Sequence, residues 1–326
     1  MEESYSTEGK YGLRGLSEPP GANVDIVFVH GLTGNRETTW TDTPTKIFWP
    51  EQLLPTDLPT ARILTFGYDA DIIHALRVAG SNTLRDHGKG LAHDLALWRM
   101  RSRTNRRPLI FVAHSLGGLV TEQALLISRN AAQQHLKDLF ECTAGIVFMG
   151  TPHLGSNKAS WAAPLTKLGN VLRKTNREIV QVLEPGSEML ANLQQEFHTM
   201  LEDSRRNNQK IVEIFCFYEE LDVGGIGKIV SDQSATLPGY QSRSIHGNHM
   251  EMTRFSGPKD PGYVAVSGQL WLWVYELENQ FPPAPVATHH NRPQYLIDSG
   301  GGAVFQGTQR AGRDINTNNV NFTRKF

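Results

Sequence analysis

The chain has 326 residues and nearly balanced charge, with 32 Lys and Arg against 33 Asp and Glu, and 39% of its residues are apolar. This length and apolar content suit one large α/β domain. Balanced charge supplies no long-range attraction to nucleic acid, so no nucleic-acid partner is expected. Two cysteines in apolar runs, Cys142 and Cys216, are too few for a disulfide scaffold or a zinc site. We therefore expect two core thiols and neither a metal nor an organic cofactor.

The first residues, MEESYS, are acidic and polar, unlike a secretory signal. Nowhere does an apolar run approach the roughly 18–20 residues that span a bilayer. The expected location is the cytoplasm, and recruitment to a membrane surface stays open.

Short runs rich in Val, Ile and Phe predict buried strands, because they mostly lack the strict alternation of a half-exposed strand. These runs are Val24–Val29, Arg62–Phe66, Leu109–Ala113, Gly145–Met149, Lys210–Phe217 and Ser242–Ile245. Helix-like stretches accompany them at Leu84–Arg101, Leu116–Arg129, Ser187–Ser204 and Gly262–Gln280. This alternation predicts the α/β class, with a mostly parallel central sheet flanked by helices. The less regular segment Leu154–Pro185 is either a lid over the site or a connecting helix pair.

The composition changes sharply after Phe281, where Pro282-Pro-Ala-Pro285 has the character of a linker. From Asn291 onward Gly, Asn, Gln and Thr dominate, and such a segment cannot bury a core of its own. The predicted organisation is an N-terminal extension (1–21), an α/β domain (22–281), a linker (282–299) and a separate tail motif (300–326).

One predicted strand runs into Ala113-His-Ser115-Leu-Gly117 and then into a helix. This is a variant of the G-x-S-x-G motif, with Ala113 in place of the first glycine. Small residues fit because the serine occupies a sharp turn that bulk would obstruct. The helix N-terminus places partial positive charge where an oxyanion develops. We predict Ser115 as nucleophile and the Leu116 N–H as oxyanion donor, the alternative being a structural turn; His114 is expected to pack beside it.

The strand ending at Val29 leads into His30-Gly-Leu32-Thr-Gly34. Lipases and esterases carry a second oxyanion donor on a glycine-containing loop after this strand. Gly31 would let the backbone approach the substrate, and Leu32 is the expected donor. The alternative interpretation is a simple β-turn.

In this motif class the nucleophile is followed in the chain by the acid and then by the histidine. His249 lies on the loop after the last predicted strand and is favoured as general base, with His246 as the alternative. The acid belongs after the strand ending at Phe217. The candidates are Glu219, Glu220, Asp222 and Asp232, and Glu219 is preferred because it follows Phe217-Tyr218 directly.

Several segments together carry a family resemblance. They are His30-Gly-Leu…Trp40-Thr, Phe48-Trp-Pro…Leu53-Leu-Pro, Ala61-Arg-Ile-Leu-Thr-Phe-Gly-Tyr-Asp-Ala, Ala113-His-Ser-Leu-Gly-Gly-Leu-Val, Gly150-Thr-Pro-His-Leu-Gly-Ser, Phe217-Tyr-Glu, and Asn248-His…Arg254-Phe…Asp260-Pro-Gly-Tyr. The string, over roughly 22–280, resembles the lipase-like (SERAC1/DUF676-type) hydrolase domains of filamentous fungi, which often form the N-terminal effector of NOD-like receptors.

The resemblance implies an α/β-hydrolase fold with a Ser/acid/His triad. It supports His249, at the histidine of the Asn-His pattern, and Glu219, at the glutamate of Phe-Tyr-Glu. It also implies that His153 shapes the wall of an acyl pocket. Phospholipid acyl chemistry is suggested by the relatives and by no residue of this chain.

The tail from Gly300 to Phe326 spaces five apolar residues among Gly, Asn and Gln, with no proline and few charges. Those residues are Val304, Phe305, Ile315, Val320 and Phe322. Such a strand could stack in register with Asn and Gln ladders. The tail resembles the amyloid signalling motifs of some fungal cell-death effectors, for which a NOD-like receptor is the template. A disordered tail is the alternative.

These observations give one preferred function and two rivals. The preferred function is a serine esterase or lipase acting on lipid or other acyl esters, gathered at a membrane by self-assembly of the tail with a NOD-like receptor. The first rival is a catalytically inactive hydrolase-fold signalling module. The second is a thioesterase or peptidase on the same triad, because the pocket rather than the triad decides the substrate.

Overall fold

A computed structural model describes residues 10–32, 34–69, 81–153, 167, 187–206 and 211–280. The chain divides into two units, Met1–Pro282 and Pro283–Phe326, and every described residue lies in the first. The predicted tail motif, and the lid or helix pair at Leu154–Pro185 apart from Lys167, lie outside the described residues.

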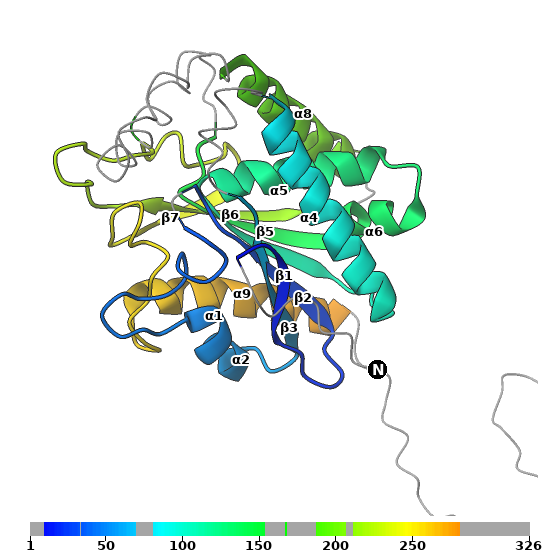
Figure 1. Cartoon of the computed structure of the whole chain (residues 1–326), viewed down its shortest axis with the longest axis horizontal. Helices are drawn as coiled ribbons and strands as arrows, with labels where there is room; N and C mark the ends of the chain where they lie inside the picture. The colour runs from blue at the N-terminus through cyan, green and yellow to red at the C-terminus, as the bar shows by residue number, and fades with distance from the viewer. Residues whose placement is uncertain are drawn as a thin grey trace, which may run out of the picture. The chain divides into compact units, whose positions relative to one another are not determined.

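A seven-stranded sheet forms the centre of the described part of the chain (Figure 1). Its strands, in sheet order, are β1 (Gly12–Ser17), β3 (Ala61–Gly67), β2 (Val24–Val29), β4 (Leu109–His114), β5 (Thr143–Met149), β6 (Glu213–Glu219) and β7 (Gln241–Ile245). Only β1 is antiparallel to its neighbour. Parallel strands need covering on both faces, which explains why β2, β3 and β4 are buried along their whole length.

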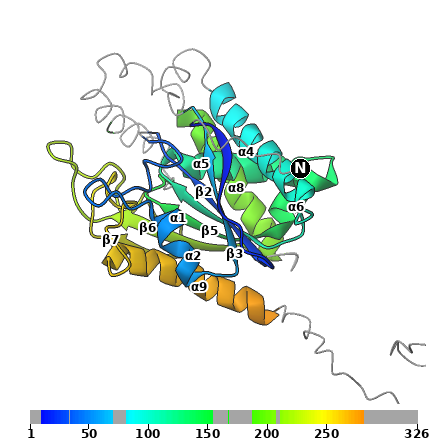
Figure 2. The same cartoon turned by 60° about the horizontal axis from the view of Figure 1, so that its bottom comes forward.

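Helices cover both faces of the sheet (Figure 2). On one face lie α4 (Ser81–Arg101), α5 (Leu116–Asn130), α6 (Gln134–Cys142) and α8 (Ser187–Arg206). On the other lie α1 (Trp49–Gln52), α2 (Leu54–Asp57) and α9 (Pro261–Gln280). A mostly parallel sheet with helices on both faces and a serine turn after β4 is the α/β-hydrolase fold, so the predicted fold class is confirmed.

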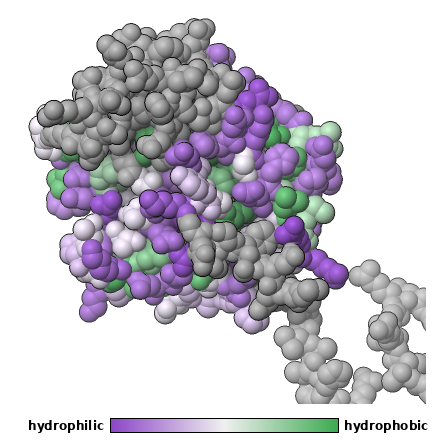
Figure 3. Space-filling model, viewed as in Figure 1, coloured by the Kyte–Doolittle hydropathy of each residue, from purple (hydrophilic) through white to green (hydrophobic). Residues whose placement is uncertain are grey.

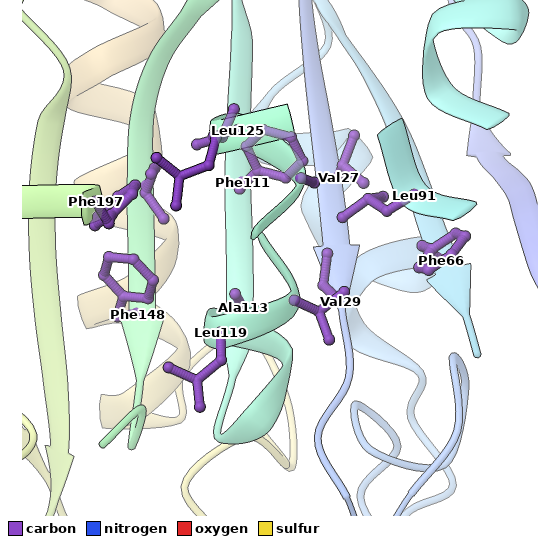
Figure 4. Close-up of a cluster of buried hydrophobic side chains, with 14 of the residues drawn as sticks. Val27, Val29, Phe66, Leu91, Phe111, Ala113, Leu119, Leu125, Phe148 and Phe197 are labelled. Carbon is purple, nitrogen blue, oxygen red and sulfur yellow. The ribbon is translucent and has the colours of Figure 1, made fainter. Parts of the chain in front are cut away.

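Alternate residues of each central strand feed two separate hydrophobic cores. Val27, Val29, Phe111 and Phe148 face α4, α5 and α8, and Figure 4 shows them beside Leu119 of α5. The intervening residues face α9 and pack on an aromatic group built around Phe28, Trp40 and Trp49. The predicted core thiols differ in exposure, since Cys216 is buried and Cys142 is half-buried.

A buried carboxylate fixes the amino end of the sheet. Asp25, at the start of β2, accepts two hydrogen bonds from Arg62, at 2.9 and 2.8 Å. Arg99 and Arg107 donate to the same carboxylate, at 2.5 and 2.9 Å. These four side chains join β2, β3, the end of α4 and the turn before β4.

Two differences from the sequence prediction stand out. Residues 12–17, assigned to the N-terminal extension, form β1 and pair with β3. The strand predicted at Lys210–Phe217 is β6, which runs from Glu213 to Glu219, so Glu219 ends the strand instead of starting the loop.

Candidate active site

The site begins with a strained turn between β4 and α5. Ser115 has φ 52° and ψ −124°, a conformation that non-glycine residues rarely adopt. Its N–H donates to the carbonyl of Met149 at 2.9 Å, which holds the turn against the end of β5. A Cβ at Gly117 would lie 2.3 Å from the His30 carbonyl oxygen, and only glycine lets α5 start this close to β2. The small residues of the motif therefore have the steric role that the sequence predicted.

His249 reaches the serine from a segment 134 residues away. Its Nε2 lies 3.0 Å from Ser115 Oγ, and both side chains are buried. The histidine follows β7 in a turn that Asn248 stabilises, since the Asn248 Oδ1 accepts from the Met250 and Glu251 N–H groups. Because Nε2 accepts the serine proton in this contact, the ring proton belongs on Nδ1.

His114 ties the nucleophile strand to the histidine turn. Its Nε2–H donates to the backbone carbonyl of His249 at 2.9 Å, and the two rings lie 5.0 Å apart. Burial, followed by the neighbouring His249, holds the pKa of His114 well below its usual value, so this ring stays neutral. A neutral ring that donates one hydrogen bond positions His249 without competing for the serine proton.

Glu219 lies behind the histidine at the end of β6. Its Oε1 is 3.6 Å from His249 Nδ1 and accepts a hydrogen bond from the Val230 N–H at 2.5 Å. Glu219 Oε2 and His249 Nδ1 are both buried and have no hydrogen-bond partner among the described residues. The carboxylate–imidazole distance of 3.6 Å would have to shorten for a hydrogen bond to form, and contacts of this kind often tighten only when substrate is bound.

The other candidate acids and the alternative base are not brought to the serine. Glu220 and His246 are exposed and pair with each other at 3.5 Å. Asp232 pairs with Lys228 at 2.7 Å on the surface, and Asp222 is exposed. Among the named acids and bases, only Glu219 and His249 are buried, with His249 in contact with Ser115 and Glu219 next to His249.

The predicted oxyanion loop lies directly against the nucleophile. A Cβ at Gly31 would be 2.8 Å from Ser115 Cβ, so glycine is required for this approach. Leu32 follows it and is buried, and Leu116 is the first residue of α5, where backbone N–H groups have no acceptor within the helix. The two predicted donors thus flank the serine from β2 and α5.

His30 fixes the conformation of this loop. Its Nδ1 donates to the Gly31 carbonyl at 2.8 Å, and its Nε2 accepts from the Tyr68 N–H at 3.2 Å. The Tyr68 hydroxyl donates to the His30 carbonyl at 2.7 Å, and the two rings stack 4.3 Å apart. Burial lowers the pKa of His30 to about 4, which keeps this single tautomer at neutral pH.

A second buried polar cluster, which the sequence analysis missed, lies on the nucleophile helix. Glu122 is seven residues after Ser115 on α5 and accepts hydrogen bonds from Gln194 of α8 at 3.2 and 3.3 Å. The same amide lies 3.1 Å from His153 Nδ1. Burial raises the pKa of Glu122 to about 8 and lowers that of His153 to about 3. His153 was expected to line an acyl pocket; the structure places it in this cluster.

Neither a metal centre nor a membrane-crossing helix occurs in the described ranges. No three or more His, Cys, Asp or Glu side chains gather there as metal ligands. No helix there combines the length and apolar character needed to cross a bilayer.

Comparisons with known proteins agree with this geometry. The family described as "Putative serine esterase (DUF676)" matches residues 25–212, more than half of the chain. Protein SERAC1 of Danio rerio is 30% identical over an alignment of 163 residues that covers 44% of this chain and 24% of the relative. Protein SERAC1 of Homo sapiens is 24% identical over an alignment of 274 residues that covers 78% of this chain and 39% of the relative. The chain therefore spans well under half the length of these relatives.

Solved structures are also similar to the chain. DBJA aligns with a TM-score of 0.48 and 13% identity, covering 83% of this chain and 96% of that one. A lipase-esterase related protein from Clostridium acetobutylicum aligns with a TM-score of 0.43 and 9% identity, covering 81% of this chain and all of that one.

Proposed function

Since the chain belongs to the DUF676 family of serine esterases, we propose that it cleaves carboxylic esters, those of lipids above all, with Ser115 as nucleophile, His249 as general base and Glu219 as the acid. The observation that carries this proposal is the 3.0 Å contact between Ser115 Oγ and His249 Nε2 on a strained strand-to-helix turn. A strained turn of this kind holds the serine oxygen at the carboxyl end of the sheet in the α/β-hydrolase motif.

In the first half of the reaction, Ser115 Oγ attacks the ester carbonyl carbon while its proton moves to His249 Nε2. The carbonyl oxygen becomes an oxyanion and accepts hydrogen bonds from the Leu32 and Leu116 N–H groups. Collapse of this intermediate breaks the bond to the leaving oxygen, which takes the proton from His249 and departs as an alcohol. Glu219 keeps the imidazole oriented and stabilises its protonated form.

In the second half, water attacks the acyl group on Ser115, and His249 takes a proton from that water. The carboxylic acid leaves and the proton returns to the serine. Besides substrate and the attacking water, the proposed steps use only groups of this chain, and the same steps would hydrolyse a thioester or a peptide. The ester proposal is favoured over those rivals by the family description.

The test is labelling by a fluorophosphonate, which reacts with an activated serine oxygen. Ser115→Ala should abolish labelling and lower kcat/KM on p-nitrophenyl esters by at least about 10⁴-fold. The matched control is Ser242→Ala, an exposed serine on β7, which should keep both. Labelling that survives in Ser115→Ala would contradict Ser115 as the nucleophile, and a wild type that is not labelled would favour the signalling-module rival.

The substrate class needs a second comparison. A panel of p-nitrophenyl esters of increasing chain length, an acyl thioester and phospholipid vesicles should show the highest kcat/KM on esters. A higher value on the thioester would favour the thioesterase rival.

A further inference from the structure

The outer face of α9 is an apolar stripe that nothing in the described part of the chain covers. Its large members are Val264, Trp271, Leu272 and Tyr275, which are 54, 50, 43 and 51% exposed. At 3.6 residues per turn these positions share one side of the helix, with Gly268 at the centre. The opposite side carries the buried residues that pack under the sheet. This helix is therefore apolar on both sides, which is unusual for a helix at the surface of a monomer.

The stripe differs from the scattered apolar residues found on any protein surface. The face in Figure 3 shows its hydrophobic residues as separate patches among hydrophilic ones. On α9, by contrast, the Trp271 and Tyr275 rings stack on each other at 5.2 Å with an interplanar angle of 15°. Stacked, preorganised Trp and Tyr side chains lose little entropy on binding and are the residues that dominate protein interfaces.

Within the described residues, nothing requires glycine at position 268. Its backbone is not in the left-handed region, and a Cβ there would meet none of the described atoms within 4 Å. A glycine in the middle of a helix is destabilising relative to alanine. A gap in the centre of an apolar stripe is useful where the backbone or a large side chain of another molecule comes close.

The charges around the stripe indicate which kind of partner would bind it. No Lys or Arg occurs in α9, and its outward carboxylate is Glu276, because Glu278 bonds to Asn23 and Thr60. Helices that lie on membranes carry cations on their polar face, so this pattern does not suit an anionic bilayer. Exposed Lys259 precedes the helix beside Asp260, whose carboxylate accepts hydrogen bonds from Ser256 and Gly262, so the free charge is a cation before the helix and a carboxylate, Glu276, toward its end.

We propose that α9 is the interface of a symmetric dimer, in which the stripe packs antiparallel on the same stripe of a second copy of this chain. A two-fold axis near residues 269–270 would place Trp271 of each copy over the partner's Gly268 gap, and Tyr275 beside the partner's Val264. The same pairing brings Glu276 toward the partner's Lys259 and opposes the two helix dipoles. Shape and charge are therefore self-complementary in one orientation.

The decisive variant is Gly268→Leu in the full chain, measured by light scattering coupled to size exclusion over a range of protein concentrations. Wild type should show twice the mass of one chain, and Gly268→Leu should show the mass of one chain at the same concentrations, a dissociation constant raised at least about 100-fold. Because a Cβ at 268 meets none of the described residues of the same chain, the melting temperature of the monomeric variant should not fall below that of dissociated wild type. Trp271→Ser should also dissociate the dimer.

The orientation has its own test. Mixing a Val264→Cys chain with a Tyr275→Cys chain and adding a short bismaleimide should cross-link the mixture, whereas either variant alone should give only the background of wild type. Cross-linking within Val264→Cys alone, or a wild type of single-chain mass at tens of micromolar, would overturn the antiparallel dimer. So would a Gly268→Leu chain that keeps the dimer mass. Phosphatidylcholine vesicle binding that Gly268→Leu strengthens and Trp271→Ser abolishes, in a protein of single-chain mass, would assign the stripe to a bilayer instead.

Discussion

At the scale of single residues, the site depends on a few contacts between buried side chains. Ser115 and His249 are in hydrogen-bond contact, whereas Glu219 and His249 stand 3.6 Å apart with an unpaired polar atom on each side. An unpaired buried polar atom costs roughly 1–3 kcal/mol, so a hydrogen bond from His249 Nδ1 to the Glu219 carboxylate would be favourable. The burial of Glu219 beside His249 supports the proposal that it orients the imidazole, which the sequence spacing alone could not decide.

Replacing the acid by its amide gives the clearest prediction at this scale. Glu219→Gln should keep an oxygen for the Val230 N–H, so the fold should persist, but the amide cannot stabilise an imidazolium. The expected loss in kcat is on the order of 10²–10⁴-fold with a melting temperature within a few degrees of wild type. The measurement is steady-state hydrolysis of a p-nitrophenyl ester beside thermal unfolding.

Glu220→Gln is the matched control for that substitution, because Glu220 is adjacent in sequence but exposed and paired with His246. It should retain activity within about twofold of wild type. Equal losses in the two variants, or full activity in Glu219→Gln, would remove Glu219 from the proposed triad.

At the scale of elements, α5 carries two buried polar systems on one helix. Ser115 caps its start, and Glu122 two turns later meets Gln194 of α8 and His153 after β5. Glu122 accepts hydrogen bonds from the neutral Gln194 amide, and burial keeps the neighbouring His153 ring neutral, so among the described residues no cation is hydrogen-bonded to this carboxyl. The carboxyl is therefore held in its protonated form up to a pH near its raised pKa of about 8.

This raised pKa predicts a pH-dependent stability. In the unfolded chain Glu122 loses its proton near its ordinary pKa of about 4.5, but in the folded chain only near 8, so stability should fall as the pH rises between these values and level off above 8. Glu122→Gln carries no proton to lose and should lack this component. In urea titrations, the unfolding free energy of Glu122→Gln minus that of wild type should increase by at most about 3–5 kcal/mol between pH 4.5 and pH 8. Parallel pH profiles for the two proteins would show that the carboxyl is not protonated when folded.

How much of this could be predicted from sequence differs by element. Strands buried on both faces, such as β2 and β4, are continuous apolar runs and were predicted with nearly correct bounds. The strand β1, GLRGLS, was missed because two glycines and an arginine hide its pattern, and only pairing with β3 makes it a strand. Ser115 stands out through its small neighbours, whereas Glu122 has the appearance of any helix-surface glutamate, since burial depends on α8 from far along the chain.

At the scale of the whole molecule, we propose that the segment 300–326 assembles the enzyme. Its spacing of apolar residues among Gly, Asn and Gln suits in-register stacking, and gathering many copies raises their effective concentration at a membrane. A peptide of residues 290–326 should form fibrils that increase Thioflavin T fluorescence. Ile315→Pro should prevent this, because proline cannot donate to the ladder. A wild-type peptide that stays non-fluorescent would remove the assembly step and leave the hydrolase proposal intact.

The two ends of the central sheet carry residues with different roles. The carboxyl ends of β2, β4, β6 and β7 carry the residues proposed for chemistry, while the amino end of β2 carries Asp25 and its three arginines. Replacing Asp25 by a neutral residue would leave three guanidinium groups without their shared anion. No rearrangement near Ser115 could offset that loss of folding stability. Substitutions at the carboxyl end of the sheet can therefore change the proposed substrate preference while the fold persists. Substitution of Asp25 at the amino end should instead unfold the protein. Among substitutions that abolish activity, those near Ser115 should accordingly leave a folded protein, whereas those near Asp25 should leave no folded protein.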